Sequence, residues 1–488
     1  MSIVLASDKT HLTNFSGDQH MHAVYMSLGN IRKEIRNKVS RCAWVLLAKL
    51  PAPKFSSVNG RTYASKEEKE RMPGILKAQL FHACMGKVLR PLCDPQLYHI
   101  VDPLGDIRQC MPFLMAWIAD LEEQYLISCL AKNNCPTCYA DFECLGKDRP
   151  KEPRTGKEIV DTMKELRAAY PGDDTWQFVT HCKQYGLAGV EKPCWEGLPV
   201  DICRVICVDL LHGLHKMFTD HIVKWLSATV GEEELDLRFM AQPHQIGLRN
   251  FGGGISKISQ WSGRENRDLE RNILTAIVGN ESATPRIIKA LRAMLDFIFK
   301  AQFPMHSDTT LESMKVNLQA FWDNVDAFHN NGARIIEHFN IPKFHILHHY
   351  IQNIRNLGTA DNYSTEIGET LHISMCKLAY RSTNRKNYSQ QIIRYLVRME
   401  AVHLYKAYLC WRNDSYPENP NVEEDCRIES TSDAEEDNDG VEPQSDNDGL
   451  NQGDFDVASG HASLGGEPRA SSLEVCTLSD FVSPATLA

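Results

Sequence analysis

The first fifty residues alternate short apolar runs with polar, turn-forming stretches. Such runs are typical of β-strands. The predicted strands are Ile3–Ala6, Ala23–Leu28 and Cys42–Ala48, with a turn at Ser16–Asp18. A fourth apolar run leads into Asp120. We therefore expect one small sheet in which the first three strands pair antiparallel and the strand before Asp120 lies beside Ile3–Ala6.

Apolar residues recur at helical spacing over most of the remaining chain. In residues 66–92, for example, Leu76, Leu80 and Cys84 fall on one buried stripe. Further helices are predicted at Glu122–Lys132, Gly156–Ala169, Val208–Thr229, Leu269–Val278, Pro285–Ala301, Pro342–Leu357, Glu366–Tyr380 and Ser389–Trp411. Because strand patterns stop near residue 120, the order favours an α+β fold: a ribonuclease-H-like mixed sheet with a large all-helical insertion.

This order divides the chain into four predicted segments. Residues 1–139 form the first part of the ribonuclease-H-like core, 140–340 the helical insertion, and 341–412 the helices that complete the core. Residues 413–488 contain 19 acidic and 2 basic side chains and few large apolar ones. Such a segment cannot bury enough apolar surface to offset its ordering entropy, so we expect a disordered acidic tail.

Composition narrows the class of protein. The body before the tail carries 51 basic and 44 acidic side chains, a balance that fits a nucleic-acid partner. No apolar stretch reaches the 18 residues of a transmembrane helix, and residues 1–8 lack the features of a signal peptide. The 16 cysteines are scattered along a long chain, which favours a reducing compartment with cysteines as core residues or metal ligands. We expect no membrane partner.

Three carboxylates have the placement that a divalent-metal site requires. Asp8 and Asp120 each follow an apolar run, at predicted strand ends, and Glu369 lies on a distant predicted helix. Two-metal phosphoryl-transfer sites use several carboxylates to hold ions about 3.5–4 Å apart. Plainer roles exist: Asp8 as a turn residue, Asp120 as a helix cap, and Glu366 and Glu369 as carboxylates favoured by a helix dipole. From spacing alone these alternatives stay open.

A second candidate metal site begins at Cys135-Pro136-Thr137-Cys138. Its two-residue gap lets both thiolates reach one tetrahedral zinc ion. The competing interpretation is a redox motif of the thioredoxin type. That motif follows a strand and opens a helix, whereas here the preceding residues have a helical pattern. One cysteine pair is half a zinc site, so two more ligands are required.

Histidines at helical spacing supply the candidates for the missing ligands. His345 and His349 are four residues apart and share a helix face, with His348 as a substitute for His349. His212 and His215, three residues apart, are a second candidate pair. Most lone histidines are packed or surface residues without a metal, so the pairing stays open at this point.

Taken together, these motifs resemble those of Plavaka-type transposases of fungal DNA transposons, relatives of the CACTA group. The resemblance extends over roughly residues 5–405. The stretches that carry it begin at Ser7-Asp8-Lys9-Thr10, Phe15-Ser16-Gly17-Asp18, Val24-Tyr25-Met26-Ser27, Trp117-Ile118-Ala119-Asp120, Cys135-Pro136-Thr137-Cys138, Asp209-Leu210-Leu211-His212, Ser364-Thr365-Glu366-Ile367-Gly368-Glu369 and Tyr380-Arg381-Ser382-Thr383-Asn384. No single motif is specific, but their number and order make the resemblance strong.

The resemblance implies a DDE-type core with its three acids at Asp8, Asp120 and Glu369. It also implies cut-and-paste DNA transposition with Mg²⁺ or Mn²⁺. Glu366 competes with Glu369, and we prefer Glu369 because the Glu-x-x-His pattern is the steadier part of the motif. The implied partners are DNA, as transposon ends and target, and a second copy if the protein is active. The implied location is the nucleus, with no small-molecule substrate.

The resemblance also bears on the zinc ligands. The wider group is similar to the catalytic subunit of the V(D)J recombinase, in which a Cys-x-x-Cys after the second Asp and two His before the Glu form a zinc module. That order matches Cys135 and Cys138 with His345 and His349, and it favours this histidine pair for a structural Zn²⁺.

One departure concerns the N-terminus. Plavaka-type transposases usually carry a long N-terminal region with a zinc finger and elements that bind terminal repeats, whereas Asp8 lies almost at the start of this chain. We therefore expect a truncated copy. The alternative is a non-catalytic remnant, decayed or domesticated, that binds DNA or protein and keeps zinc as a structural element.

Overall fold

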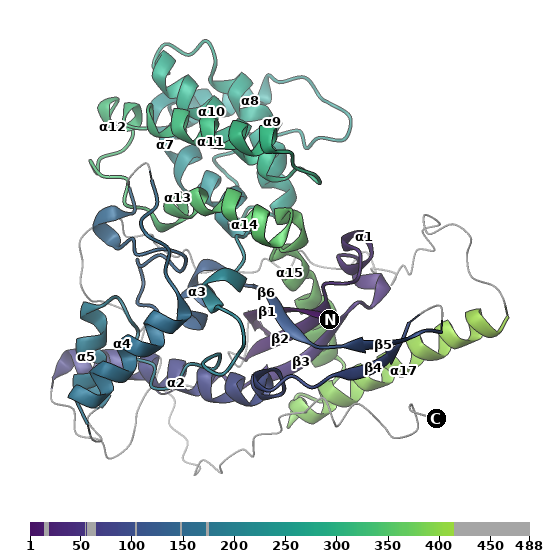
Figure 1. Cartoon of the computed structure of the whole chain (residues 1–488). Helices are drawn as coiled ribbons and strands as arrows, with labels where there is room; N and C mark the ends of the chain where they lie inside the picture. The colour runs from purple at the N-terminus through teal and green to yellow at the C-terminus, as the bar shows by residue number, and fades with distance from the viewer. Residues whose placement is uncertain are drawn as a thin grey trace.

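A four-stranded mixed sheet forms the centre of the molecule, in the order β3-β2-β1-β6 (Figure 1). The computed structural model describes residues 1–13, 19–53, 55, 65–102, 105–146, 149–171 and 175–413. The strands are β1 Ser2–His11, β2 His20–Leu28, β3 Trp44–Leu50 and β6 Phe113–Ile118. β2 is antiparallel to β1 and β3, and β6 is parallel to β1. Both predictions about the sheet are confirmed. The predicted turn at Ser16–Asp18 and almost all of the predicted tail lie outside the described residues.

Helices cover both faces of the sheet because side chains alternate along each strand. Val4 and Ala6 pack with the C-terminal helices, and Ile3 and Leu5 pack on the opposite side. The first face is covered by α15 Glu366–Leu371, the π-helical η7 His372–Lys377, α16 Leu378–Arg381 and α17 Tyr388–Arg412. The second is covered by α2 Lys66–Cys93, α3 Leu121–Ile127, α4 Gly156–Ala169, α5 Thr175–Gln184 and α6 Ile202–Val205.

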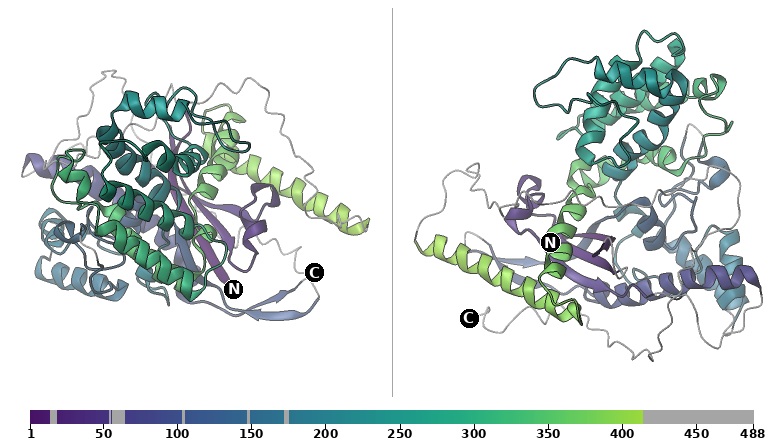
Figure 2. Two further views of the ribbon diagram at one scale, coloured as in Figure 1. Left: turned by 90° about the horizontal axis from the view of Figure 1, so that it is seen from above. Right: turned by 180° about the vertical axis from the view of Figure 1, so that it is seen from behind.

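A separate helical unit has its own core, from Val208 to Ala360, and stands above the sheet in Figure 1. Figure 2 shows the same separation from behind. Its elements are η3 Leu211–Lys216, η4 Phe218–Val223, α7 Lys224–Val230, α8 Glu232–Met240, α9 Gly263–Ile277, α10 Pro285–Ala301, α11 Asp308–Trp322, α12 Ala327–Asn330, α13 Pro342–Ile346, η5 Leu347–His349 and α14 Tyr350–Leu357. No helix in the described ranges is long and apolar enough to cross a membrane.

Short elements complete the described chain: α1 Lys33–Arg36, η1 Val39–Arg41, η2 Phe142–Cys144, η6 Ala360–Asn362 and the hairpin β4 Tyr98–Val101 with β5 Ile107–Cys110. The hairpin was not predicted, because almost all of its side chains are exposed and its apolar pattern is weak. The placement of Asp8 at a strand end was wrong. β1 continues to His11, since residues 8–11 pair with residues 20–23 of β2.

Several predicted helices are shorter or interrupted. The helix predicted at Glu122–Lys132 ends at Ile127, because the backbone turns left-handed at Cys129 with φ +60°. The helix predicted at Pro342–Leu357 contains the tighter turn η5. The helix predicted from Val208 starts at Leu211 and runs through two π-helical segments before α7. Gly156–Ala169 and Pro285–Ala301 have the predicted bounds.

The core beneath the sheet contains a histidine that must stay neutral. His82 of α2 is buried; its Nε2 donates to the Leu126 carbonyl at 2.8 Å, and its Nδ1 accepts from the Cys194 N–H at 3.1 Å. Only a neutral imidazole can donate through one nitrogen and accept through the other. Burial lowers the pKa of His82 to about 4.

We expect this histidine to make the fold acid-labile. The unfolded chain binds a proton at His82 near its ordinary pKa of 6.5, whereas the folded chain resists it down to about 4. Its contribution is therefore fully present above pH 6.5 and is lost progressively as the pH falls to 4, by about 3 kcal/mol in all. Urea unfolding at pH 7 and pH 4.5 should show this extra loss relative to His82→Gln, which keeps one donor and one acceptor. An equal loss in both proteins would contradict the assignment.

Candidate metal centres

Four buried side chains from distant parts of the chain meet in one cluster that could hold a metal such as zinc. The ligand atoms of Cys135, Cys138, His345 and His349 all lie within 4.8 Å of one another. Cys135 Sγ is 3.2 Å from His349 Nε2, and Cys138 Sγ is 3.2 Å from His345 Nε2. The two Nε2 atoms are 3.4 Å apart. A tetrahedral zinc with bonds of about 2.0–2.3 Å needs ligand atoms roughly 3.3–3.8 Å apart, so the residues fit the ion.

The local sequence holds the two cysteines in place. The Cys135 N–H donates to the Ala140 carbonyl at 2.9 Å, and the Thr137 N–H points at Cys135 Sγ at 3.4 Å. Arg154 is buried behind the loop, and its Nε donates to the carbonyls of Cys135 and Cys138 at 3.3 and 3.4 Å. These hydrogen bonds hold the Cys135–Cys138 loop, called the knuckle below, in one conformation.

The electrostatics of the cluster favour a thiolate. The pKa of Cys138 lies well below its ordinary value. The largest cause is a hydrogen bond from Cys135. Burial acts in the opposite direction, and hydrogen bonds from His345 and His349 lower the pKa further. Burial, followed by the neighbouring Cys138, raises the pKa of Cys135. A metal ion bound by both sulfur atoms would supply positive charge that stabilises two thiolates.

The alternative histidines lie elsewhere. His215 is fully buried against Glu270, with Nδ1 2.8 Å from a carboxylate oxygen, and His212 bonds to Asp209. His348 stacks on Trp322 with a centroid separation of 5.7 Å. None of the three belongs to the four-residue cluster. The order-based choice of His345 and His349 over the other candidates therefore agrees with the geometry.

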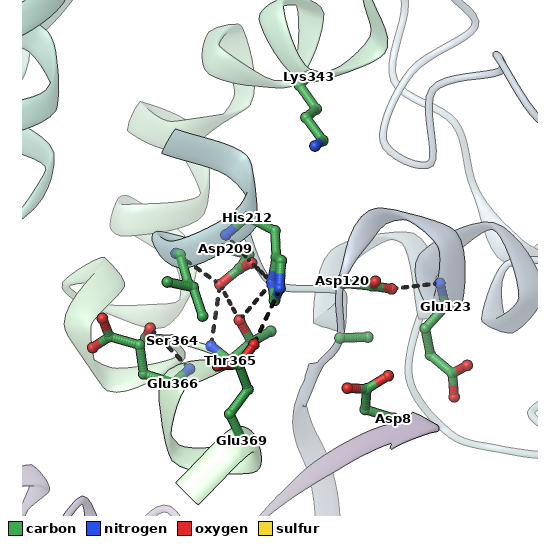
Figure 3. A network of polar contacts seen from close by, with 12 residues as sticks. Asp8, Asp120, Glu123, Asp209, His212, Lys343, Ser364, Thr365, Glu366 and Glu369 are labelled. Atoms are coloured by element: carbon green, nitrogen blue, oxygen red, sulfur yellow. Dashed lines mark hydrogen bonds and ion pairs between the residues drawn. The ribbon is translucent and has the colours of Figure 1, made fainter. Parts of the chain in front are cut away.

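Asp8 lies in β1, and Asp120 follows the end of the neighbouring strand β6 by two residues. The parallel register pairs Ala6 with Ile118, so Asp8 and Asp120 are each two residues further along on the same face. Adjacent strands lie about 4.8 Å apart, far inside the roughly 12 Å beyond which two carboxylates cannot share a metal site. Figure 3 shows the Asp8 and Asp120 side chains close to each other.

Asp120 has the helix-capping role that was considered from the sequence. Its carboxylate accepts the Glu123 N–H at 2.8 Å and caps α3. Burial, followed by the neighbouring Asp8, raises its pKa to about 6, against the hydrogen bond from Glu123 and the nearby His212. Two carboxylates in this position repel each other, and a cation between them would relieve the repulsion.

Glu369 and Glu366 point to different partners. His212 Nε2 lies 3.3 Å from Glu369 Oε1, and the Glu369 side chain is 53% exposed. Glu366 forms an ion pair with Arg267 of α9. In Figure 3 the Glu369 side chain reaches up to His212, while Glu366 is turned away from it. The three acids do not close into a cluster as tight as the Cys/His group among the described residues.

Sequence reasoning missed the residues that hold Glu369. His212 bridges two acids, with Nδ1 2.9 Å from Asp209 Oδ2 and Nε2 toward Glu369. Burial would lower the pKa of His212, but Asp209 and Glu369 raise it to about 10, so the ring is an imidazolium at neutral pH. Asp209 is buried and also accepts from the Thr365 N–H at 3.1 Å and its hydroxyl at 2.8 Å. The available signal was the Asp-x-x-His spacing of Asp209 and His212, whereas the zinc alternative predicted from the sequence concerned His212 with His215.

The fold and the site together define an α+β protein with a buried Cys₂His₂ cluster able to hold a metal. Comparison with known families gives a match over somewhat less than half of the chain: residues 1–226 match the family model described as Plavaka transposase. Over these residues the match confirms the resemblance found in the sequence, and it supports a Plavaka-type transposase. It includes Asp8, Asp120, both knuckle cysteines and His212, and ends before Glu369. No curated protein matches the chain.

Proposed function

We propose that this chain is the catalytic region of a DDE-type transposase, in which Asp8, Asp120 and Glu369 bind Mg²⁺ or Mn²⁺ for DNA cleavage and strand transfer. The observation that carries the proposal is the parallel register of β1 and β6, which aligns Asp8 with Asp120 on the face that α15 covers. The Plavaka match, which implies DNA as the partner, points in the same direction.

The sheet supports a ribonuclease-H-like core. Three antiparallel strands are followed in space by β6, parallel to β1, and a further parallel bridge joins Trp117 to Ile206. This bridge places one further short parallel segment beside β6, three residues before Asp209. In such a core an acid on the first strand and an acid after the fourth strand, counted along the chain, meet a helical glutamate that returns from the far end of the chain.

Each residue has a separate task in the proposed site. Divalent ions bound by such carboxylates activate the attacking water or 3′-hydroxyl and neutralise the leaving oxygen. Asp8 and Asp120 supply ligands from a rigid sheet, and Asp120 keeps its orientation through the α3 cap. His212 holds the half-exposed Glu369 near them, and Asp209 with Thr365 fixes His212.

Zinc would act at a distance from the DNA chemistry. The cysteines follow Asp120 by fifteen and eighteen residues, and the histidines precede Glu369 on the returning chain. A zinc ion on these four ligands would tie the segment after α3 to α13 and η5. We infer that it keeps the returning helices docked, so that Glu369 stays at the sheet.

The remaining parts of the proposal follow from transposition itself. The DNA partners are the transposon ends and the target. Two copies of the chain act together when the protein is active, and DNA cleavage and strand transfer take place in the nucleus. The Plavaka family match underlies these inferences.

A second candidate is a non-catalytic remnant that binds DNA or protein. One observation favours it. Among the described residues the ligand atoms of the Cys/His cluster lie close enough to share one metal ion, whereas the Glu369 carboxylate forms an ion pair with His212. In this case the zinc site would be structural and the acids would be inherited without use.

Paired glutamine variants separate the two candidates. We expect Glu369→Gln to lower Mg²⁺-dependent nicking of a plasmid carrying the genomic flanks of this gene by roughly 100-fold or more, because it removes one metal ligand. Glu366→Gln, which breaks only the surface ion pair with Arg267, should change it less than about threefold. Equal activity of Glu369→Gln and wild type would exclude Glu369. Absence of metal-dependent nicking in all three proteins would favour the remnant.

A further inference from the structure

A chain of buried side chains lies behind Asp8. His372 is 4% exposed, and its Nε2 is 3.3 Å from Asp8 Oδ2. Its other nitrogen, Nδ1, is 2.9 Å from the hydroxyl of Tyr25, which is 3.0 Å from Cys376 Sγ. Tyr25 and Cys376 are both fully buried. The chain therefore joins an exposed carboxylate to the interior of the protein.

The fold dictates this juxtaposition. On β2, Ala23 stands opposite Asp8 and Tyr25 stands opposite Ala6, so Asp8 and Tyr25 are diagonal neighbours on one sheet face. His372 and Cys376 are four residues apart on η7 and share a helix face. η7 contacts both β1 and β2, which brings the imidazole between the carboxylate and the phenol.

The hydrogen bonds can be ordered in one consistent direction. A carboxylate only accepts, so His372 Nε2–H donates to Asp8. With a neutral ring, Nδ1 is then an acceptor, the Tyr25 hydroxyl donates to it, and the Cys376 thiol donates to the Tyr25 oxygen. Every donor in the chain is used once. The ring is thus held from its far side by Tyr25, which is bonded in turn to Cys376, and a rotation of the ring away from Asp8 would also break its bond to Tyr25.

Asp8 keeps room for a cation in this arrangement. Its Oδ1 accepts the Lys9 N–H at 2.6 Å and its Oδ2 accepts from His372. Each carboxylate oxygen has two lone pairs, so each retains one. The side chain is 43% exposed, so solvent reaches it.

We propose that His372 is a positioning residue that fixes the Asp8 carboxylate for a divalent cation, and that Tyr25 and Cys376 fix His372. The inference rests on the proposed function, because it concerns the same cation site. Hydrogen-bonded partners of ligating carboxylates orient the ligands, and their loss typically weakens metal binding about 10- to 100-fold. The competing interpretation is an ordinary buried contact that only attaches η7 to the sheet.

Mn²⁺ binding, measured by the electron paramagnetic resonance signal of free Mn²⁺ over zinc-loaded protein, distinguishes these interpretations. His372→Asn keeps a polar group near Tyr25 but is too short to reach Asp8, and we expect it to weaken Mn²⁺ binding about 10- to 100-fold. In His372→Gln the longer amide can still donate to Asp8, and affinity should stay within about threefold of wild type. Tyr25→Phe should give an intermediate loss. Zinc content and melting temperature monitor the fold.

The possible failures are distinct. If Asp120→Asn loses Mn²⁺ while His372→Asn binds like wild type, the positioning role is wrong and the proposed metal site stands. If His372→Asn and His372→Gln weaken binding equally and lower the melting temperature together, the contact is structural and the inference is overturned. If wild type and Asp120→Asn bind Mn²⁺ equally, or neither binds it, the proposed metal site is wrong and this inference falls with it.

Discussion

Replacing Asp120 by Asn should reduce metal-dependent DNA cleavage by roughly 1,000-fold or more. The metal ions supply several kcal/mol of transition-state stabilisation, and each 1.4 kcal/mol corresponds to a factor of ten in rate. Stability should hardly change, because Asn caps helices about as well as Asp and can still accept the Glu123 N–H. The loss would then report on the charge of the carboxylate and not on α3. The measurement is the initial rate of plasmid nicking against Mg²⁺ concentration.

Asp141→Asn is the matched control. Asp141 is exposed, precedes the short η2 and makes no capping hydrogen bond through its side chain. It should cleave DNA at the wild-type rate. Equal rates for Asp120→Asn, Asp141→Asn and wild type would contradict the assignment of Asp120, and a melting temperature far below wild type for Asp120→Asn would show that the substitution acts through the fold.

Replacing His349 by Gln should release the metal and destabilise the protein by on the order of 5 kcal/mol or more. Structural zinc sites contribute about 10–16 kcal/mol of apparent binding free energy, and binding to a site that exists only in the folded chain stabilises that chain. The buried cluster joins the knuckle after α3 to the helices before Glu369. Elemental analysis should find about one zinc per wild-type chain, and thermal unfolding with and without a chelator should show the stabilisation.

Two neighbours serve as controls for the zinc prediction. His348 lies beside His349 but stacks on Trp322, and Cys144 is buried near the knuckle but is not a member of the cluster. His348→Gln and Cys144→Ser should both retain zinc. Full zinc content in His349→Gln, or its loss in His348→Gln alone, would mean that the ligand assignment is wrong.

The sheet could be predicted because its strands are apolar runs, but their ends could not. Asp8, Lys9 and Thr10 look like a turn in the sequence, yet β1 continues through them because β2 supplies hydrogen-bond partners as far as His20. That information is in the partner strand, not in the local pattern. The β4–β5 hairpin shows the opposite case: it carries almost no buried side chain, so its sequence has little strand signal.

The four residues of the Cys/His cluster were predictable because cysteine and histidine spacings limit the choices, and the resemblance to the V(D)J recombinase module favoured one histidine pair. The two glutamates were not separable in the same way, since both lie at the start of one helix. Their difference comes from Arg267 and His212, which are distant in sequence and become neighbours only after the helical unit has folded. The spacing of Asp209 and His212 is visible in the sequence. The contact of His212 with Glu369 is not, because it depends on where the fold places Glu369.

The central claim is that Asp8, Asp120 and Glu369 form one divalent-cation site. The most direct test is anomalous diffraction from crystals of the zinc-loaded protein soaked in Mn²⁺, with data collected on both sides of the manganese absorption edge. We expect a manganese peak within ligand distance of the Asp8 and Asp120 carboxylates, next to Glu369, and a separate zinc peak at Cys135, Cys138, His345 and His349. Zinc density at the cluster with no manganese at the aspartates under saturating Mn²⁺ would contradict the claim.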